Sequence, residues 1–202
     1  TEAGIEVLEL GGNVVDAAVA ACFAVGVVEP ASSGLGGGGY LVFQVGDRSG
    51  VVGFPMRGPL RARPDMYELT PDPAVGAFGW NGVVDDANIE GYQSVSTPGA
   101  VAGLCKAHEM LGRIPLRHVM APAVRLAREG FAPDWFSIYA LGLQAGTFHR
   151  FSELRSIFMP EGVMPTGSAT SPARIRQVQL ADVLEAIATE GPDVYYKGDV
   201  AR

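Results

Sequence analysis

The side chain best suited to chemistry in this sequence is Arg57, in the segment Gly53-Phe-Pro-Met-Arg57-Gly-Pro59. We expect a strand to end at Phe54 and a long loop to begin at Pro55, so that Arg57 follows a strand end. A guanidinium in such a place can present two parallel N–H donors to a carboxylate. An ordinary surface salt bridge fits the same position, so position alone leaves both roles open.

A glycine-rich segment, Gly34-Leu-Gly-Gly-Gly-Gly39, matches the pattern GxGxxG of dinucleotide-binding loops. Those loops follow a strand and open a helix, whose N-terminus holds the pyrophosphate. Here a helical segment precedes the glycines and a strand follows them, so the required order is reversed. We therefore interpret the segment as a tight backbone crossing where only glycine fits, and we predict no cofactor.

Other candidates for nucleophilic or acid–base chemistry have weaker support. Thr1 could be an N-terminal nucleophile with its own amine as base, but such a residue normally begins a strand, and Thr1 begins a helical segment. Asp85 and Asp86 are adjacent in a loop, where carboxylates are usually solvated turn residues. The three histidines form no HxxxH or HExxH pattern, and the sequence has no GxSxG motif. We expect helix faces and surface positions for these histidines, which are His108, His118 and His149.

The two cysteines, Cys22 and Cys105, lie in apolar helical stretches and in no CxxC motif. We expect two buried free thiols, with a single long-range disulfide as the alternative. Histidine or aspartate partners at ligand spacing are absent, so we predict no metal site.

Composition indicates a folded chain and excludes several classes of function. The 202 residues are 48% hydrophobic and 18% charged, against a usual charged share of about 25%. The net charge of −7, with 15 scattered Lys and Arg residues, provides no basic patch, so we predict no nucleic-acid partner. The longest apolar run, 14–28, is shorter than the ~20 residues that cross a bilayer, so we predict no membrane span in this chain.

Hydrophobic periodicity predicts five helices, at residues 2–10, 14–28, 98–111, 116–127 and 180–187. Asn13 and Asp16 are spaced to cap the second helix, and Thr97 is placed to cap the third. The second helix is apolar on all sides and is therefore expected to be buried on every side.

A hairpin is predicted from strands 40–45 and 51–54 with a five-residue turn between them. Neither strand alternates between polar and apolar residues, so we expect a sheet covered on both sides, within a layered sandwich of helices and strands. The following loop, 55–95, is long enough to suggest a functional or partner-covering segment. No linker divides the chain.

Five segments together resemble the γ-glutamyltranspeptidase family. They are GGNVVDAAVA at 11–20, VEPASSGLGGGG at 28–39, TPGAVAG at 97–103, PAVRLAREGF at 122–131 and VYYKGDVA at 194–201. Their order and spacing look like the front of that family's large subunit, and the resemblance spans nearly the whole chain.

The resemblance implies an α+β fold, the four-layer αββα sandwich of N-terminal-nucleophile hydrolases. Residues 1–202 would be a large-subunit segment of one such domain, incomplete and inactive without the small subunit cut from the same precursor. A threonine at the start of the small subunit would attack a γ-glutamyl amide such as glutathione, and the acyl group would pass to water or an amine. The nucleophile, and with it every catalytic residue, would then lie outside this chain. The family is commonly exported, which favours export over a cytoplasmic location.

The same resemblance implies a role for Arg57, because the family has an arginine after this hairpin that holds the α-carboxylate of the substrate. Gly58-Pro59 follows Arg57 where the family usually has a glutamate, so Arg61 and Arg63 remain competing candidates. Related acylases hydrolyse glutaryl side chains of β-lactams, and a carboxylate-binding arginine would serve those substrates equally. A γ-glutamyl substrate is therefore implied first, a glutaryl amide is the alternative, and a non-catalytic relative is the third possibility.

Overall fold

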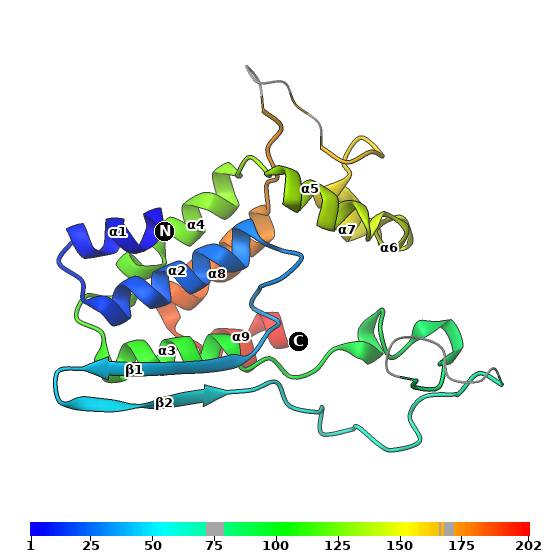
Figure 1. Ribbon diagram of the computed structural model, residues 1–202, viewed down its shortest axis with the longest axis horizontal. Coiled ribbons are helices and arrows are strands. Elements are labelled where there is room, and N and C mark those ends of the chain that lie inside the picture. The colour runs from blue at the N-terminus through cyan, green and yellow to red at the C-terminus, as the bar shows by residue number, and fades with distance from the viewer. Residues whose placement is uncertain (72–78, 166, 168–171) are drawn as a thin grey trace.

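The computed structural model describes residues 1–71, 79–165, 167 and 172–202, so part of the long loop predicted at 55–95 lies outside the described residues. A layer of packed helices lies on one side of the molecule and a two-stranded hairpin on the other (Figure 1). Helix α3 (Ala100–Leu111) lies between them and runs along the hairpin.

The chain begins with two packed helices, α1 (Glu2–Glu9) and α2 (Val14–Val28), close to the predicted ranges. Gly11 turns the chain between them with φ +88°, a conformation that glycine adopts without steric cost. The predicted capping box is confirmed. The Asn13 side chain accepts N–H bonds from Val15 and Asp16, and the Asp16 carboxylate accepts the N–H of Asn13 at 2.8 Å.

Asp16 also joins this turn to the connection between α3 and α4 (Leu116–Glu129). Its side chain is fully buried, and both of its oxygens accept the backbone N–H of Arg113, at 3.1 and 2.9 Å. His108 Nε2 lies 3.3 Å from the same carboxylate. In return, the Asn13 amide donates to the Leu111 carbonyl at 2.7 Å. A buried carboxylate is thus fully hydrogen-bonded between two connections that lie about 100 residues apart in the sequence.

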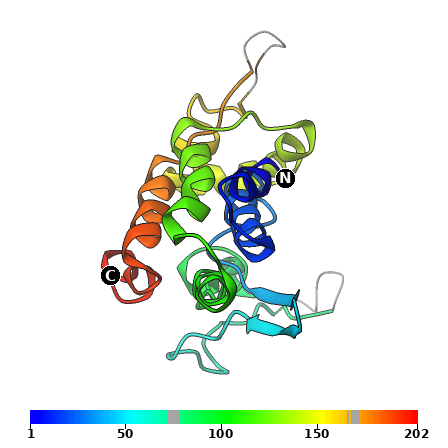
Figure 2. The same ribbon diagram turned by 90° about the vertical axis from the view of Figure 1, so that its left-hand side faces the viewer.

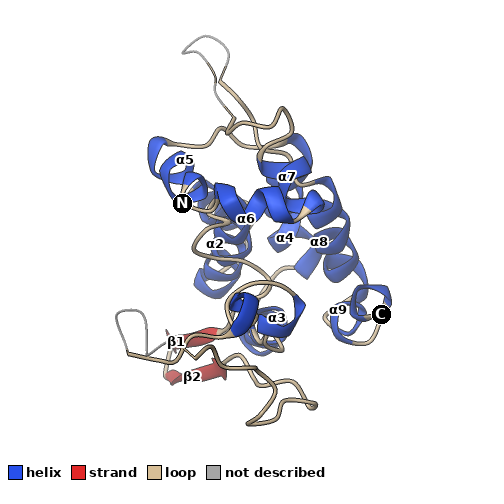
Figure 3. Cartoon of the chain, turned by 90° about the vertical axis from the view of Figure 1, so that its right-hand side faces the viewer, coloured by secondary structure: helices blue, strands red, loops and turns tan. Residues whose placement is uncertain are grey.

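The core lies where α4 packs between α2 and α8 (Val178–Glu190), as Figures 2 and 3 show from two sides. The predicted apolar faces of the last three helices are confirmed. Their fully buried members include Val101, Val119, Met120, Ala123, Leu184 and Ile187. Gly130 and Gly191 end α4 and α8 with φ +84° and +88°. The predicted cap of α3 is wrong, because that helix begins after Gly99 and Thr97 pairs with another segment.

The hairpin consists of β1 (Gly39–Val45) and β2 (Arg48–Phe54), paired antiparallel with Gly39 opposite Phe54 and Val45 opposite Arg48. The prediction of a five-residue turn was wrong. Only Gly46 and Asp47 connect the strands, because Gly46 adopts φ +58° and permits a two-residue turn.

One face of this hairpin packs on α3, and the described residues leave the other uncovered. Tyr40, Val42 and Val51 on that face are 70%, 77% and 60% exposed. The expectation of a sheet covered on both sides is therefore not met within these residues. Helix α2 is likewise not buried on every side, since Cys22 on it is exposed. The prediction of a buried Cys22 was wrong, whereas Cys105 is buried, and both thiols are free.

Several short elements were not predicted from the sequence. They are α5 (Trp135–Gly142), α6 (Ala145–Arg150), α7 (Ser152–Phe158), α9 (Asp193–Tyr196), η1 (Val84–Asp86), η2 (Tyr92–Ser94) and η3 (Asp199–Ala201). The long loop is anchored to α6 through Glu90, which accepts from Thr147 Oγ1 at 2.8 Å and from Arg150 at 2.6 Å. Among the described helices, none combines the length and the apolarity that a membrane crossing requires.

Candidate substrate-binding site

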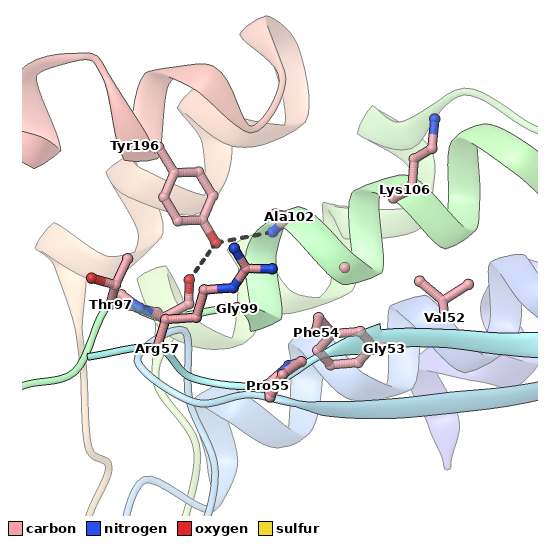
Figure 4. A pocket seen from close by; sticks show the side chains of 12 residues that line it. Val52, Gly53, Phe54, Pro55, Arg57, Thr97, Gly99, Ala102, Lys106 and Tyr196 are labelled. Carbon is pink, nitrogen blue, oxygen red and sulfur yellow. Dashed lines mark hydrogen bonds between the residues drawn. The ribbon is translucent and has the colours of Figure 1, made fainter. Parts of the chain in front are cut away.

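A cleft of about 360 Å³ opens where β2 ends (Figure 4). Its walls are the end of β2, residues 97–99, the first turns of α3 and Tyr196 of α9. Arg57 and Lys106 both line it. Lys106 Nζ lies 3.0 Å from the Glu109 carboxylate. Among the described residues that line the cleft, Arg57 is therefore the cation without an acidic partner inside the chain.

The backbone of Arg57 is fixed by an isolated antiparallel bridge to Thr97. The N–H of Arg57 donates to the Thr97 carbonyl at 3.0 Å, and the N–H of Thr97 donates to the Arg57 carbonyl at 2.8 Å. The Arg57 side chain is exposed, and Figure 4 shows its guanidinium extending into the cleft toward the hydroxyl end of Tyr196. Because the Arg57 backbone is fixed and no described residue pairs with its guanidinium, the side chain can bind a carboxylate through two parallel N–H bonds.

Three glycines allow the strand end before Arg57 to lie against its neighbours. A Cβ added to Gly99 would overlap the Phe54 carbonyl, and one on Gly103 would overlap the Phe54 ring. A Cβ on Gly38 would come within 2.6 Å of the Met56 nitrogen. The expected tight crossing is found at Gly38, whereas an added Cβ on Gly34 or Gly36 would meet nothing within 4 Å. The segment lies between α2 and β1, the reverse of the order in a dinucleotide loop.

The start of α3 depends on contacts that the sequence did not reveal. Gly99 and Ala100 both donate their N–H groups to the Gly37 carbonyl at 3.0 Å. The Tyr196 hydroxyl accepts the N–H of Ala102 at 3.1 Å and donates to the Pro98 carbonyl at 2.9 Å. Our sequence interpretation did not identify Tyr196 as a site residue. Its position within VYYKGDVA, one of the segments that carried the resemblance, was the available signal.

The competing arginines do not line the cleft. Arg61 is exposed, and the exposed Arg63 pairs with Asp65 at 3.1 Å. Asp85 and Asp86 are exposed turn residues with φ +57° and +52°, which agrees with their interpretation as solvated carboxylates.

The remaining candidates for chemistry also lie away from the cleft. Thr1 precedes α1 and begins no strand. His118 and His149 are exposed on helices, and His108 faces Asp16. The cleft lining, as far as the chain is described, includes no histidine, cysteine or carboxylate. Within the same described residues, no cluster of three or more His, Cys, Asp or Glu side chains is arranged to hold a metal ion.

The sequence of this chain was compared with known protein families and with curated proteins. The family model described as gamma-glutamyltranspeptidase matches residues 1–202. The chain belongs to the gamma-glutamyltranspeptidase family. Among curated relatives, glutathione hydrolase 3 of Arabidopsis thaliana is 35% identical over 100% of this chain and 29% of its own length. The acylase ACY 1 proenzyme of Pseudomonas sp. (strain SE83) is also 35% identical, over 99% of this chain and 35% of its own length. The chain thus spans about a third of these gamma-glutamyltranspeptidase relatives.

Solved structures give the same result for the fold. The gamma-glutamyltranspeptidase of Helicobacter pylori superposes with a TM-score of 0.82 at 30% identity, covering 99% of this chain and 54% of that one. A cephalosporin acylase from Bacillus halodurans superposes with a TM-score of 0.81 at 24% identity, covering 99% of this chain and 36% of that one, which bears on the fold alone. The predicted fold class, that of the N-terminal-nucleophile hydrolases, is confirmed.

Proposed function

We propose that this chain is a large-subunit segment of a gamma-glutamyltranspeptidase-like enzyme, and that Arg57 binds the α-carboxylate of the γ-glutamyl donor. The observation that carries the proposal is the guanidinium of Arg57 in a cleft, where no described residue pairs with it, on a backbone held by the bridge to Thr97. The glutathione hydrolases among the relatives support a γ-glutamyl donor.

In this proposal the chain binds and orients the donor, and the nucleophile comes from elsewhere. A guanidinium and a carboxylate form charge-assisted hydrogen bonds that fix both distance and direction. Fixing the donor in this way removes much of the entropic cost of bringing its amide carbonyl to a nucleophile. That nucleophile would be the first threonine of a small subunit, which forms an acyl-enzyme and releases the acyl group to water or an amine.

The small subunit would cover the surfaces that this chain leaves open. The uncovered hairpin face presents Tyr40, Val42 and Val51, which are apolar residues expected against a second sheet rather than in water. Both glutathione hydrolases and acylases among the relatives are named as proenzymes, which supports a precursor that is cut into subunits. Residues 1–202 would then form one part of a domain that the small subunit completes.

A glutaryl amide acylase is the second candidate, because the ACY 1 acylase is as similar to this chain as the plant glutathione hydrolase. A glutaryl group carries a terminal carboxylate but no α-amine, so Arg57 would bind it in the same way. Hydrolysis rates for γ-glutamyl and glutaryl 4-nitroanilide distinguish the two. A non-catalytic relative, the third possibility, would hydrolyse neither.

The role of Arg57 is tested by KM in the complete enzyme. We expect Arg57→Ala to raise KM for γ-glutamyl 4-nitroanilide about 10- to 100-fold, the effect of losing hydrogen bonds between charged groups. Arg57→Lys should recover part of this loss, because a lysine keeps the charge but not the two-pronged geometry. Arg61→Ala and Arg63→Ala are the matched controls and should leave KM unchanged. An unchanged KM in Arg57→Ala, or a rise in either control instead, would contradict the assignment.

A further inference from the structure

Tyr196 also lines the cleft, and it comes from a part of the sequence about 100 residues from α3. Its hydroxyl donates to the Pro98 carbonyl and accepts the N–H of Ala102, so both of its hydrogen-bonding functions are used (Figure 4). The first N–H groups of a helix have no partner within the helix and need one from outside. No neighbouring side chain caps α3, and Tyr196 supplies the partner for the third of its residues.

The Pro98 carbonyl is one residue away from the bridge that holds Arg57. Thr97 exchanges both backbone hydrogen bonds with Arg57, and Pro98 follows directly. Tyr196 therefore joins Pro98 to the first turn of α3 through its two hydrogen bonds. Residues 97–99 are held by Arg57 at Thr97 and by Tyr196 at Pro98. Any displacement of this segment moves the backbone of Arg57 with it.

Burial favours the neutral, protonated form of Tyr196, which its hydrogen bond to the Pro98 carbonyl requires. Its side chain is partly buried, and burial raises the pKa of Tyr196 above its ordinary value of 10. A neutral phenol retains the O–H that Pro98 accepts, so the contact persists at any pH at which the enzyme would work.

We propose that Tyr196 is a positioning residue for the acyl donor, acting through Pro98 and Thr97 on the placement of Arg57. The inference rests on the proposed function of Arg57, and it assigns to Tyr196 no contact with the reacting atoms.

The test is Tyr196→Phe in the complete enzyme, which removes the hydroxyl and keeps the ring. We expect KM for γ-glutamyl 4-nitroanilide to rise about three- to tenfold, the effect of losing a hydrogen bond that aligns a binding group, with kcat changed less than about twofold. KM does not depend on the concentration of active enzyme, so it describes the molecules that have folded even if the yield of folded enzyme falls. Tyr195→Phe is the matched control, because the Leu35 carbonyl, at 3.4 Å, is the one hydrogen-bond partner of its hydroxyl among the described residues. Its KM should equal that of the wild type.

A double-mutant cycle separates the positioning role from a general structural one. If Tyr196 acts through Arg57, then Tyr196→Phe should have no further effect on KM in an Arg57→Ala background. An unchanged KM in Tyr196→Phe, or an equal rise in both backgrounds, would overturn the inference while the role of Arg57 stood. An unchanged KM in Arg57→Ala alone would instead refute the proposed function, and the positioning role would fall with it.

Discussion

Arg57 and Thr97 lie 40 residues apart and exchange both of their backbone hydrogen bonds, at 3.0 and 2.8 Å. This bridge extends the pairing of the chain beyond the end of β2 and fixes the one residue that carries the proposed binding chemistry. The segment that follows Thr97 is held in turn by the close approach of Gly99 to the Phe54 carbonyl and by the hydrogen bond from Tyr196 to the Pro98 carbonyl. The predictions below test these supports and the surfaces around them.

Gly99→Ala should damage the site through steric overlap alone. The backbone of Gly99 has an ordinary negative φ, so the substitution causes no conformational strain, but its Cβ would overlap the Phe54 carbonyl. We expect a loss of about 1–3 kcal/mol in stability and a raised KM, measured by thermal unfolding and kinetics of the complete enzyme. Gly36→Ala is the control, because nothing lies within 4 Å of its added Cβ. Equal behaviour of the two variants would refute the steric account.

Asp16→Ala should be strongly destabilising because two backbone donors lose a buried acceptor. The N–H groups of Asn13 and Arg113 both donate to this fully buried carboxylate. His108 Nε2 lies 3.3 Å from it and has its own hydrogen-bond partner in the Ile114 carbonyl at 2.8 Å. We expect a loss of about 2–4 kcal/mol in the free energy of unfolding, read from denaturant midpoints. Glu109→Ala removes a carboxylate that is 71% exposed and should cost less than about 1 kcal/mol. If Asp16→Ala lowered the free energy of unfolding as little as Glu109→Ala does, the account would be contradicted, because water would then be satisfying the donors that Asp16 accepts from.

The Glu6–Arg125 pair should contribute stability that depends on pH. Two hydrogen bonds of 3.1 and 2.6 Å join the side chains, and the bond to Arg125 lowers the pKa of Glu6 below its ordinary 4.5. A lowered pKa means that the stabilisation is complete above the unfolded-state value and is lost as the pH falls through the folded-state value. Both side chains are more than a third exposed, so we expect Glu6→Gln to cost only about 0.2–1 kcal/mol at pH 7.

The measurement for this pair is the difference in unfolding midpoint between the wild type and Glu6→Gln at neutral and at acidic pH. The difference should vanish below the lowered pKa of Glu6. Glu9→Gln, on the same helix and exposed, should show no difference at either pH. A difference that persisted in acid would mean that Glu6 stabilises the fold by packing and not by charge.

The uncovered hairpin face should be needed for assembly. Val42 is 77% exposed in this chain, yet we propose that the small subunit covers it, so Val42→Asp should reduce the yield of assembled, two-subunit enzyme. Ile5→Asp is the control, because Ile5 is 50% exposed on α1, on the other side of α2 from the hairpin (Figure 1). Size-exclusion chromatography with gel analysis measures the yield. Normal assembly of Val42→Asp would refute this assignment of the interface.

The sequence was most informative where local chemistry decides the structure. Asn13 and Asp16 predicted a capping box, and the apolar stripes of α3, α4 and α8 predicted their buried faces, because both signals depend on residues within one or two turns. Thr97 shows the limit of such reasoning. It stands where a cap is expected, but pairing with the distant Arg57 takes precedence, and a distant tyrosine supplies the helix contact instead.

Exposure was the least predictable property of the chain. Cys22 and Val42 lie in apolar segments that predict complete burial, and both are exposed here. Hydrophobicity indicates that a surface will be covered, but it does not say which chain covers it. The position of Arg57 in a cleft likewise depended on long-range packing of Phe54 against Gly99 and Gly103, which no local pattern reveals.

The most direct test of the central claim is the preference of the complete enzyme for a carboxylate-bearing acyl group. The quantity is the ratio of kcat/KM for γ-glutamyl 4-nitroanilide to that for 4-aminobutyryl 4-nitroanilide, which keeps the amine and lacks the α-carboxylate. If Arg57 binds that carboxylate, Arg57→Ala should lower the ratio about 10- to 100-fold, almost entirely through the γ-glutamyl substrate. An unchanged ratio in Arg57→Ala would contradict the account, because the enzyme would then recognise the carboxylate without this arginine.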